Sequence, residues 1–282
     1  MKHSRRLLAS AVLLVLVAMA PASALGYSTA TVFGTWEVPP TDIAGLGSPR
    51  SQIIVKSFSP GMNVVAYLDK AKAYGQKVAV YFMDTVDYAT GTIYPSRIKA
   101  WVDKIKTHTA LYGYLSVKEP SWNHISLTEM RTLYKAYKAA DPTHRVIALL
   151  GDVPHFGSTA NPWSTGVANM LWVDWYPVTW SRGYIATAST WFPKVRSYVD
   201  RVTPGTPIFL MVQGHGYRAG DRRTPSAAQL EREVRDGFTY LKANGILFHT
   251  WNNPRYDTDL KRNTALWSTV RSIMSRVRAG TF

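Results

Sequence analysis

The sequence contains no cysteine among its 282 residues. Disulfides, thiolate metal sites and cysteine nucleophiles are therefore excluded, and a folded domain must rest on core packing. Acidic residues are also scarce, with 18 Asp and Glu against 33 Lys and Arg, which gives a formal charge of +15. This excess favours anionic surfaces as partners. Apart from residues 218–223 and 255–262, the basic residues are scattered, and they match no nucleic-acid module, so we expect no nucleic-acid partner.

Only one apolar run is long, and it lies at the start of the chain. Three basic residues precede Leu7–Ala20, and the small residues Ala22-Ser23-Ala24 follow it. This order predicts a cleaved signal peptide over residues 1–24 and a secreted mature chain over 25–282, with a charge of +12 and no membrane association. An uncleaved membrane anchor is the alternative, but the run is short for a membrane span.

Short apolar segments alternate with amphipathic stretches along the mature chain. Strands are expected at residues 30–37, 52–58, 77–84, 111–117, 145–150, 170–177, 207–213 and 245–251. Helices are expected at residues 63–74, 95–108, 126–140, 189–202, 226–244 and 264–278. Strands that are almost continuously apolar are typical of parallel sheets covered on both faces. Eight such units predict one α/β domain, a (β/α)8 TIM barrel over residues 25–282. A doubly wound open sheet would show a Gly-rich phosphate turn after an early strand, which is absent.

Polar residues stand where the predicted strands end, which in a barrel is the functional rim. They are Glu37, Asp84, Glu119, Asp152, Asp174 and Gln213. Two carboxylates across a site can cleave a glycosidic bond, since one donates a proton and the other attacks or activates water. We expect Glu119 to be the acid and Asp174 its partner, with Asp84 as the second choice. Glu37 and Asp152 are expected to position groups.

Aromatic residues are abundant, with 10 Trp and 16 Tyr. Flat side chains beside polar groups suit sugar rings, although each Trp could equally fill the core. The candidate substrate-binding residues are Trp36, Glu37, Tyr81, Asp152, Tyr176, Trp180, Gln213, His215, Trp251 and Asn252. The expected partner is a carbohydrate, anionic polymers included, bound by a monomer.

Metal and serine-hydrolase chemistry find little support in the sequence. The histidines show no ligand spacing, and His249 inside a predicted strand is expected to be a core residue. No Gly-x-Ser-x-Gly elbow is present. We therefore expect neither a metal nor a cofactor.

Several short motifs together resemble glycoside-hydrolase-like TIM barrels of the secreted bacterial type. These motifs lie at Leu111–Pro120, which ends in Glu-Pro, at Asp141–Arg145, at Asp174–Pro177, at Gln213–His215 and at Gly245–Trp251. The resemblance covers most of the mature chain. It implies the barrel fold and a catalytic strand-four Glu119.

Two positions depart from the pattern that this family shows. Lys118 stands where relatives often have Asp, and an ammonium beside a general acid favours loss of its proton. Because adjacent strand residues point to opposite faces, we expect Lys118 to point away from Glu119. Gln213 stands where retaining relatives carry a nucleophilic Glu, and an amide cannot attack.

Three functions therefore stay open. The first is glycoside hydrolysis by Glu119 with Asp174 or Asp84. The second is a non-catalytic barrel that binds carbohydrate or cell wall. The third is a lyase or esterase acting on an acidic polysaccharide, with Arg182 and Arg218 holding uronates or sulfates.

Overall fold

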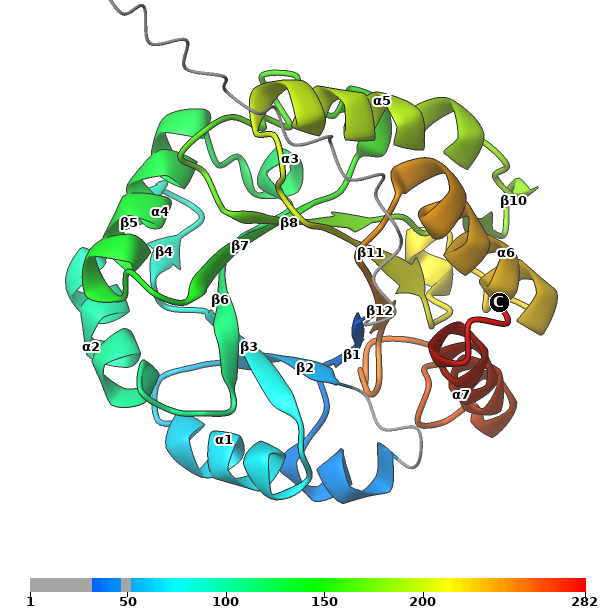
Figure 1. Cartoon of the computed structure of the whole chain (residues 1–282), viewed down its shortest axis with the longest axis horizontal. Coiled ribbons are helices and arrows are strands. Elements are labelled where there is room, and N and C mark those ends of the chain that lie inside the picture. The colour runs from blue at the N-terminus through cyan, green and yellow to red at the C-terminus, as the bar shows by residue number, and fades with distance from the viewer. Residues whose placement is uncertain (1–31, 47–51) are drawn as a thin grey trace, which may run out of the picture.

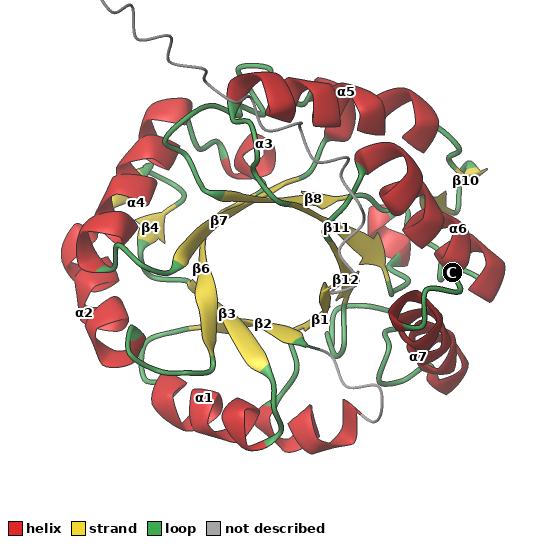
Figure 2. Ribbon diagram, viewed as in Figure 1, coloured by secondary structure: helices red, strands yellow, loops and turns green. Residues whose placement is uncertain are grey.

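The chain forms a closed barrel of parallel strands with helices around it (Figures 1 and 2). The computed structural model describes residues 32–46 and 52–282. The predicted signal peptide over residues 1–24 lies outside these ranges. The barrel strands are β1 (Val32–Trp36), β2 (Ile53–Phe58), β3 (Lys77–Phe82), β6 (Leu111–Lys118), β7 (Arg145–Leu150), β8 (Met170–Asp174), β11 (Ile208–Gln213) and β12 (Gly245–His249). Their order around the barrel is β1-β12-β11-β8-β7-β6-β3-β2, so the predicted (β/α)8 TIM barrel is confirmed.

Helices follow most of the strands, as the periodicity predicts. They are α1 (Val64–Ala73), α2 (Pro95–Ile105), α3 (Pro120–Asn123), α4 (Leu127–Ala140), α5 (Ala188–Val202), α6 (Ala227–Asp236) and α7 (Thr264–Arg278). Short 3-10 helices η1 (Pro40–Leu46) and η2 (Val153–His155) follow β1 and β7, and η3 (Arg218–Gly220) lies after β11. The prediction of a helix over residues 226–244 is wrong in its last part. The chain there forms a π-helical turn, η4 (Gly237–Leu241), and ends at Lys242 with a left-handed φ of 54°. No helix within residues 32–46 and 52–282 has the length and apolar character to cross a membrane.

Two small hairpins lie in the loops at the carboxyl ends of the strands, and the sequence did not predict them. Strands β4 (Val86–Asp87) and β5 (Thr92–Ile93) pair in the loop after β3. Strands β9 (Val178–Thr179) and β10 (Gly183–Tyr184) pair in the loop after β8. Each strand has two residues, too few for apolar alternation to reveal it.

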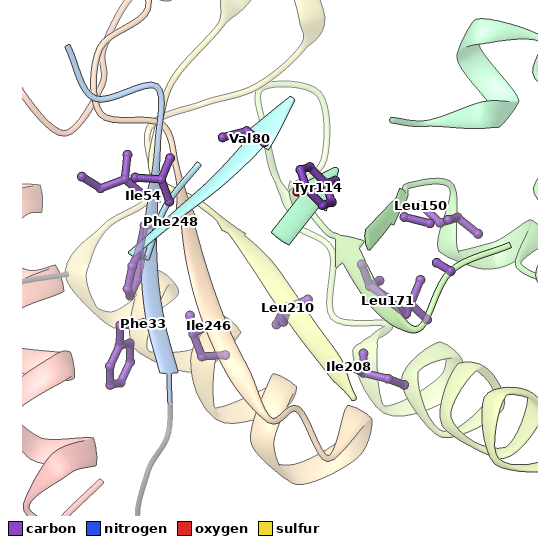
Figure 3. Packing of buried hydrophobic residues seen from close by; sticks show 14 of the residues in the cluster. Phe33, Ile54, Val80, Tyr114, Leu150, Leu171, Ile208, Leu210, Ile246 and Phe248 are labelled. Atoms are coloured by element: carbon purple, nitrogen blue, oxygen red, sulfur yellow. The ribbon is translucent and has the colours of Figure 1, made fainter. Parts of the chain in front are cut away.

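The strands bury both of their faces. One face packs against the helices, as the side chains of Phe33, Ile54, Tyr114 and Leu210 show (Figure 3). The other face forms a second cluster drawn almost entirely from strands. It includes Ile53, Val55, Ala79, Leu115, Ile147, Leu149, Met170, Trp172, Phe209, Met211 and Leu247. This alternation fills the barrel with side chains, so chemistry is confined to its rim.

The motif Asp141–Arg145 is structural. Asp141 Oδ2 accepts a hydrogen bond from the Tyr114 hydroxyl on β6 at 2.7 Å, and its Oδ1 accepts from the Thr143 backbone N–H at 2.8 Å. Burial raises the pKa of Asp141, but hydrogen bonds from Thr143, Tyr114 and the His144 backbone outweigh it and lower the pKa below its usual value. The carboxylate therefore ties the end of α4 to β6 and to the start of β7.

Replacing Asp141 by Asn tests this bond network. A lowered pKa means that the carboxylate contributes fully above its ordinary value near 3.8 and loses that contribution as pH falls through the folded value. We expect Asp141→Asn to lose about 2 kcal/mol of unfolding free energy at pH 7 and less at pH 3, measured by urea denaturation. Asp103→Asn, which removes exposed ion pairs with Lys99 and Lys106, is the control and should change little. An equal loss at both pH values would contradict this account.

Candidate active site

The carboxyl ends of β6 and β8 bring Glu119 and Asp174 together across the intervening strand β7. Gly151 follows β7, and a Cβ at this position would lie 2.6 Å from Asp174 Oδ1. Glycine therefore leaves the space through which the Asp174 side chain passes over the end of β7. Asp174 is 6% exposed, whereas 24% of the Glu119 side chain is exposed. Asp174, the predicted first-choice partner of Glu119, interacts with it electrostatically.

The two carboxyl groups interact electrostatically, and the buried Asp174 Oδ1 has no hydrogen-bond partner within the described residues. Burial raises the pKa of Asp174 well above its usual value, and the neighbouring Glu119 carboxyl raises it further, against a smaller opposing effect of Lys118. Asp174 therefore keeps a proton that an ordinary Asp would lose. The pair therefore consists of a protonated Asp174 beside the Glu119 carboxyl group.

Lys118 contacts Glu119, so the prediction that its side chain points away is wrong. Its Nζ lies 3.4 Å from Glu119 Oε2 and 5.4 Å from the centroid of the Trp36 ring. Two backbone features break the alternation. The β6–β7 register shifts between Leu115 and Val117, and Glu119 adopts a left-handed φ of 46° just beyond the strand. An ammonium thus balances the Glu119 carboxylate at the rim.

The turn that carries Glu119 is fixed by its own hydrogen bonds. The Glu119 N–H donates to the Leu149 carbonyl on β7 at 2.7 Å. Asn123 Nδ2 on α3 donates to the carbonyls of Lys118 and Glu119. Pro120, which cannot extend the ladder, begins α3 immediately after. These contacts hold the carboxylate at the rim.

Four tyrosines lie within electrostatic range of Glu119. Burial is the main cause that raises the pKa of Tyr81, Tyr88, Tyr176 and Tyr256, and the charge of Glu119 adds to each. The hydroxyls of Tyr81 and Tyr88 share a hydrogen bond. Phenols of this kind stay protonated and can donate to sugar hydroxyls. Tyr88 and Tyr256 were not among the predicted site residues, because both lie in loops without a sequence pattern.

Two neutral histidines complete the same side of the rim. His215 Nδ1 lies 2.9 Å from the His249 carbonyl, which only accepts, so Nδ1 carries the hydrogen. Burial is the main cause that lowers the pKa of His215 to about 4 and that of His249 well below its usual value. His215 stacks on Tyr256 with ring centroids 4.4 Å apart, and His249 contacts Tyr176 at 5.5 Å. His249 is buried, as predicted for a core residue, but its Nδ1 has no partner within the described residues.

Three predicted site residues form hydrogen bonds with groups other than the carboxyl pair. Asp84 Oδ1 accepts a hydrogen bond from Trp101 Nε1 on α2 and lines a pocket between α1 and α2, so its carboxylate engages the helix layer and not Glu119. The fully buried Gln213 amide bonds only to backbone groups, including Val178 N–H and the carbonyls of Val178 and Arg223. Trp251 Nε1 donates to Asp42 Oδ2 and its ring packs on Trp267.

The remaining candidates take varied positions around the rim. Glu37 has a left-handed φ of 56°, binds Lys56 Nζ at 2.5 Å and accepts from the Ser57 N–H at 2.9 Å. Asp152 pairs with His155 Nδ1 at 2.8 Å. Trp36 contacts the His249 ring at 5.5 Å, and Trp180 is 53% exposed. Asn252 follows Trp251 and is partly exposed. No group of three or more metal-ligating side chains occurs within the described part of the chain.

Comparison with known proteins identifies solved structures that share this fold. No family model and no curated protein sequence matches the chain. The solved structures it resembles include glycoside hydrolases. A GH2 β-galacturonidase from Eisenbergiella tayi bound to galacturonate matches with a TM-score of 0.61 and 12% identity over 86% of this chain and 50% of that one. A β-galactosidase from the psychrophilic Marinomonas ef1 matches with a TM-score of 0.64 and 10% identity over 88% of this chain and 60% of that one.

A family 39 glycoside hydrolase from the gut symbiont Bacteroides cellulosilyticus WH2 gives a TM-score of 0.55 and 14% identity. It is matched over 79% of this chain and 57% of its own length. The chain thus spans about half to three fifths of the length of these relatives. At such identities the likeness shows the shared barrel.

The raised pKa of Asp174 predicts how the stability of the protein depends on pH. The folded protein holds a proton that the unfolded chain releases near pH 3.8, so wild type loses stability as pH rises from that value toward the folded pKa. Asp174→Asn has no proton to lose. We expect the unfolding free energy of this variant, relative to that of wild type, to increase from pH 4 to pH 8 when both are measured by urea denaturation. Asp141→Asn, whose carboxyl shifts the opposite way, is the control, and a pH-independent difference for Asp174→Asn would contradict the assignment.

Proposed function

We propose that this protein is a secreted glycoside hydrolase that uses Glu119 and Asp174 at the barrel rim to cleave O-glycosidic bonds. The observation that carries the proposal is the pair of interacting carboxyl groups at the rim, in which burial and Glu119 raise the pKa of Asp174. Glycosidases need one carboxylic acid and one carboxylate at the scissile bond. The signal-like amino-terminal pattern supports secretion.

The environments of the two acids assign their roles in a way that reverses the sequence-based expectation. Asp174, with its raised pKa, is the proton donor, and Glu119, paired with Lys118, is the carboxylate. When a glycosidic oxygen binds next to Asp174, Asp174 protonates it and the leaving group departs as an alcohol. Glu119 attacks the anomeric carbon and forms a glycosyl ester. Water then adds at that carbon, gives a proton to Asp174 and releases Glu119.

The closeness of the pair predicts the stereochemistry. Inverting glycosidases hold their carboxyl groups about 6.5–9.5 Å apart to admit a water, whereas retaining enzymes hold them at about 5–5.5 Å. The direct electrostatic interaction of Glu119 with Asp174 favours the shorter separation. Cleavage with retention of the anomeric configuration is therefore the expected outcome.

The surroundings of the pair suit a sugar. The phenols of Tyr81, Tyr88, Tyr176 and Tyr256 offer donors and apolar faces around Glu119. His215 and His249 are neutral and add no charge that would compete for the carboxylate. The glycosidase identity of several structural neighbours gives further support.

A non-catalytic carbohydrate-binding barrel is the second candidate. Gln213 occupies the strand-seven position at which the resembled family carries a nucleophile, and its amide is fully engaged by backbone groups. The ion pair of Lys118 with Glu119 also neutralises the exposed acid. Such a protein would bind polysaccharides and release no product.

Product analysis separates the two functions. The purified mature chain is incubated with plant, fungal and bacterial polysaccharides, and reducing ends and oligosaccharides are measured. We expect release from at least one substrate, with kcat/KM lowered by about 100-fold or more in Glu119→Gln and in Asp174→Asn. NMR of the first product should show the retained anomer.

Asp84→Asn is the matched control, because it removes a rim carboxylate that engages Trp101 in place of Glu119. Its kcat/KM should stay within a few-fold of wild type. Full activity in Glu119→Gln would reject the proposed catalytic pair. Binding to the same polysaccharides without released product would reject hydrolysis and favour the second candidate.

A further inference from the structure

An exposed tryptophan and three arginines stand in two loops at the outer part of the rim. Trp180, in the hairpin of β9 and β10, is 53% exposed, and the Arg218 guanidinium lies 5.3 Å from its ring centroid. Arg182 and Arg222 lie in the same two loops. Neither of them, nor Arg218, forms an ion pair with a carboxylate of the described residues. We call Trp180, Arg182, Arg218 and Arg222 the outer platform.

The acids close to the outer platform are occupied with backbone groups. Asp221 Oδ1 accepts hydrogen bonds from the N–H groups of Trp180 and Ser181 at 3.1 and 3.0 Å. These bonds and the Ser181 hydroxyl lower the pKa of Asp221, so it stays ionised. Asp257 Oδ2 accepts from the Arg218 N–H at 2.6 Å. The carboxylates thus fix the two loops, while the guanidinium of Arg218 faces the Trp180 ring.

The outer platform is continuous with the carboxyl pair. The ring of Tyr217, next to Arg218, lies 5.2 Å from Tyr256. Tyr256 in turn stacks on His215, and burial and the Glu119 charge raise its pKa to about 12. Arg222 acts electrostatically on Tyr256 as well. The rings of His215, Tyr256 and Tyr217 therefore form a strip that leads outward toward the β9–β10 hairpin. Strand β10 lies at the outer edge of the molecule (Figure 1).

We propose that the outer platform is a subsite for an anionic sugar residue, a uronate or a sulfate ester, of the polysaccharide that reaches the carboxyl pair. This inference rests on the proposed function and specifies its substrate class. The indole face suits the C–H face of a sugar ring, and a guanidinium fork binds carboxylate or sulfate oxygens with two hydrogen bonds. The charge of +12 on the mature chain attracts such polymers from a distance.

Binding is measured in a Glu119→Gln background, where hydrolysis does not interfere. The probes are polygalacturonate for uronates, dextran sulfate for sulfate esters, and neutral dextran. We expect at least one anionic probe to bind ten-fold or more tightly than dextran at low salt, with the affinity falling as salt rises. Arg218→Gln and Trp180→Ala should each weaken that binding about five-fold or more, and the preferred probe distinguishes uronate from sulfate.

Arg201→Gln is the matched control. Arg201 also lies over an aromatic ring, that of Tyr198 at 5.0 Å, but it stands in the last turn of α5, away from the carboxyl-end loops. This variant removes the same charge and should bind the anionic probe within two-fold of its parent. An equal loss in Arg201→Gln would show that only the overall charge attracts the polymer, which would overturn the subsite.

Other outcomes separate this inference from the proposed function. Equal binding of dextran and both anionic probes would reject the anionic subsite. Hydrolysis of neutral glycans alone would do the same while leaving the catalytic pair intact. A single-stranded DNA oligonucleotide or vesicles of anionic phospholipid that bind more tightly than both polysaccharides, with the same dependence on Trp180 and Arg218, would assign the outer platform to a different partner.

Discussion

The contact between Glu119 and Asp174 is the interaction on which the rest of the rim depends. A buried carboxyl beside a second carboxyl is stable only when one of the two keeps a proton. Gly151 makes this contact possible, because any side chain at the end of β7 would block Asp174. The left-handed turn at Glu119 and the bonds from Asn123 then present the second acid. Backbone shape at two strand ends therefore sets the proton arrangement of the pair.

The sequence predicts the barrel well because apolar segments that are buried on both faces leave a strong signal. All eight strands lie where the runs indicate, with differences of a few residues at their ends. The same signal locates Glu119 and Asp174, since each stands where an apolar run stops. The position of a residue at a strand end does not show which way its side chain points, however. Asp84 turns to Trp101 on the helix layer, and Gln213 turns to loop backbone.

Other parts of the site depend on features that leave no periodic trace. The register shift near Ser116 and the left-handed backbone of Glu119 bring Lys118 to the carboxylate, against the alternation expected for a regular strand. Tyr88 and Tyr256 come within electrostatic range of Glu119 from loops whose sequences have no pattern. Their placement depends on the closed barrel, which gathers distant loops at one rim. Only three-dimensional structure could reveal that gathering.

The amide of Gln213 has a consequence for how this rim can change. It bonds to Val178, at the base of the loop that carries Trp180, and to Arg223, in the loop that carries Arg218. One buried side chain thus clamps two loops that are distant in sequence. A loop exchange that removed either backbone partner would leave a buried amide unsatisfied, which is costly. New specificities on this scaffold would therefore arise by changing surface side chains of both loops together, with their backbones kept in place.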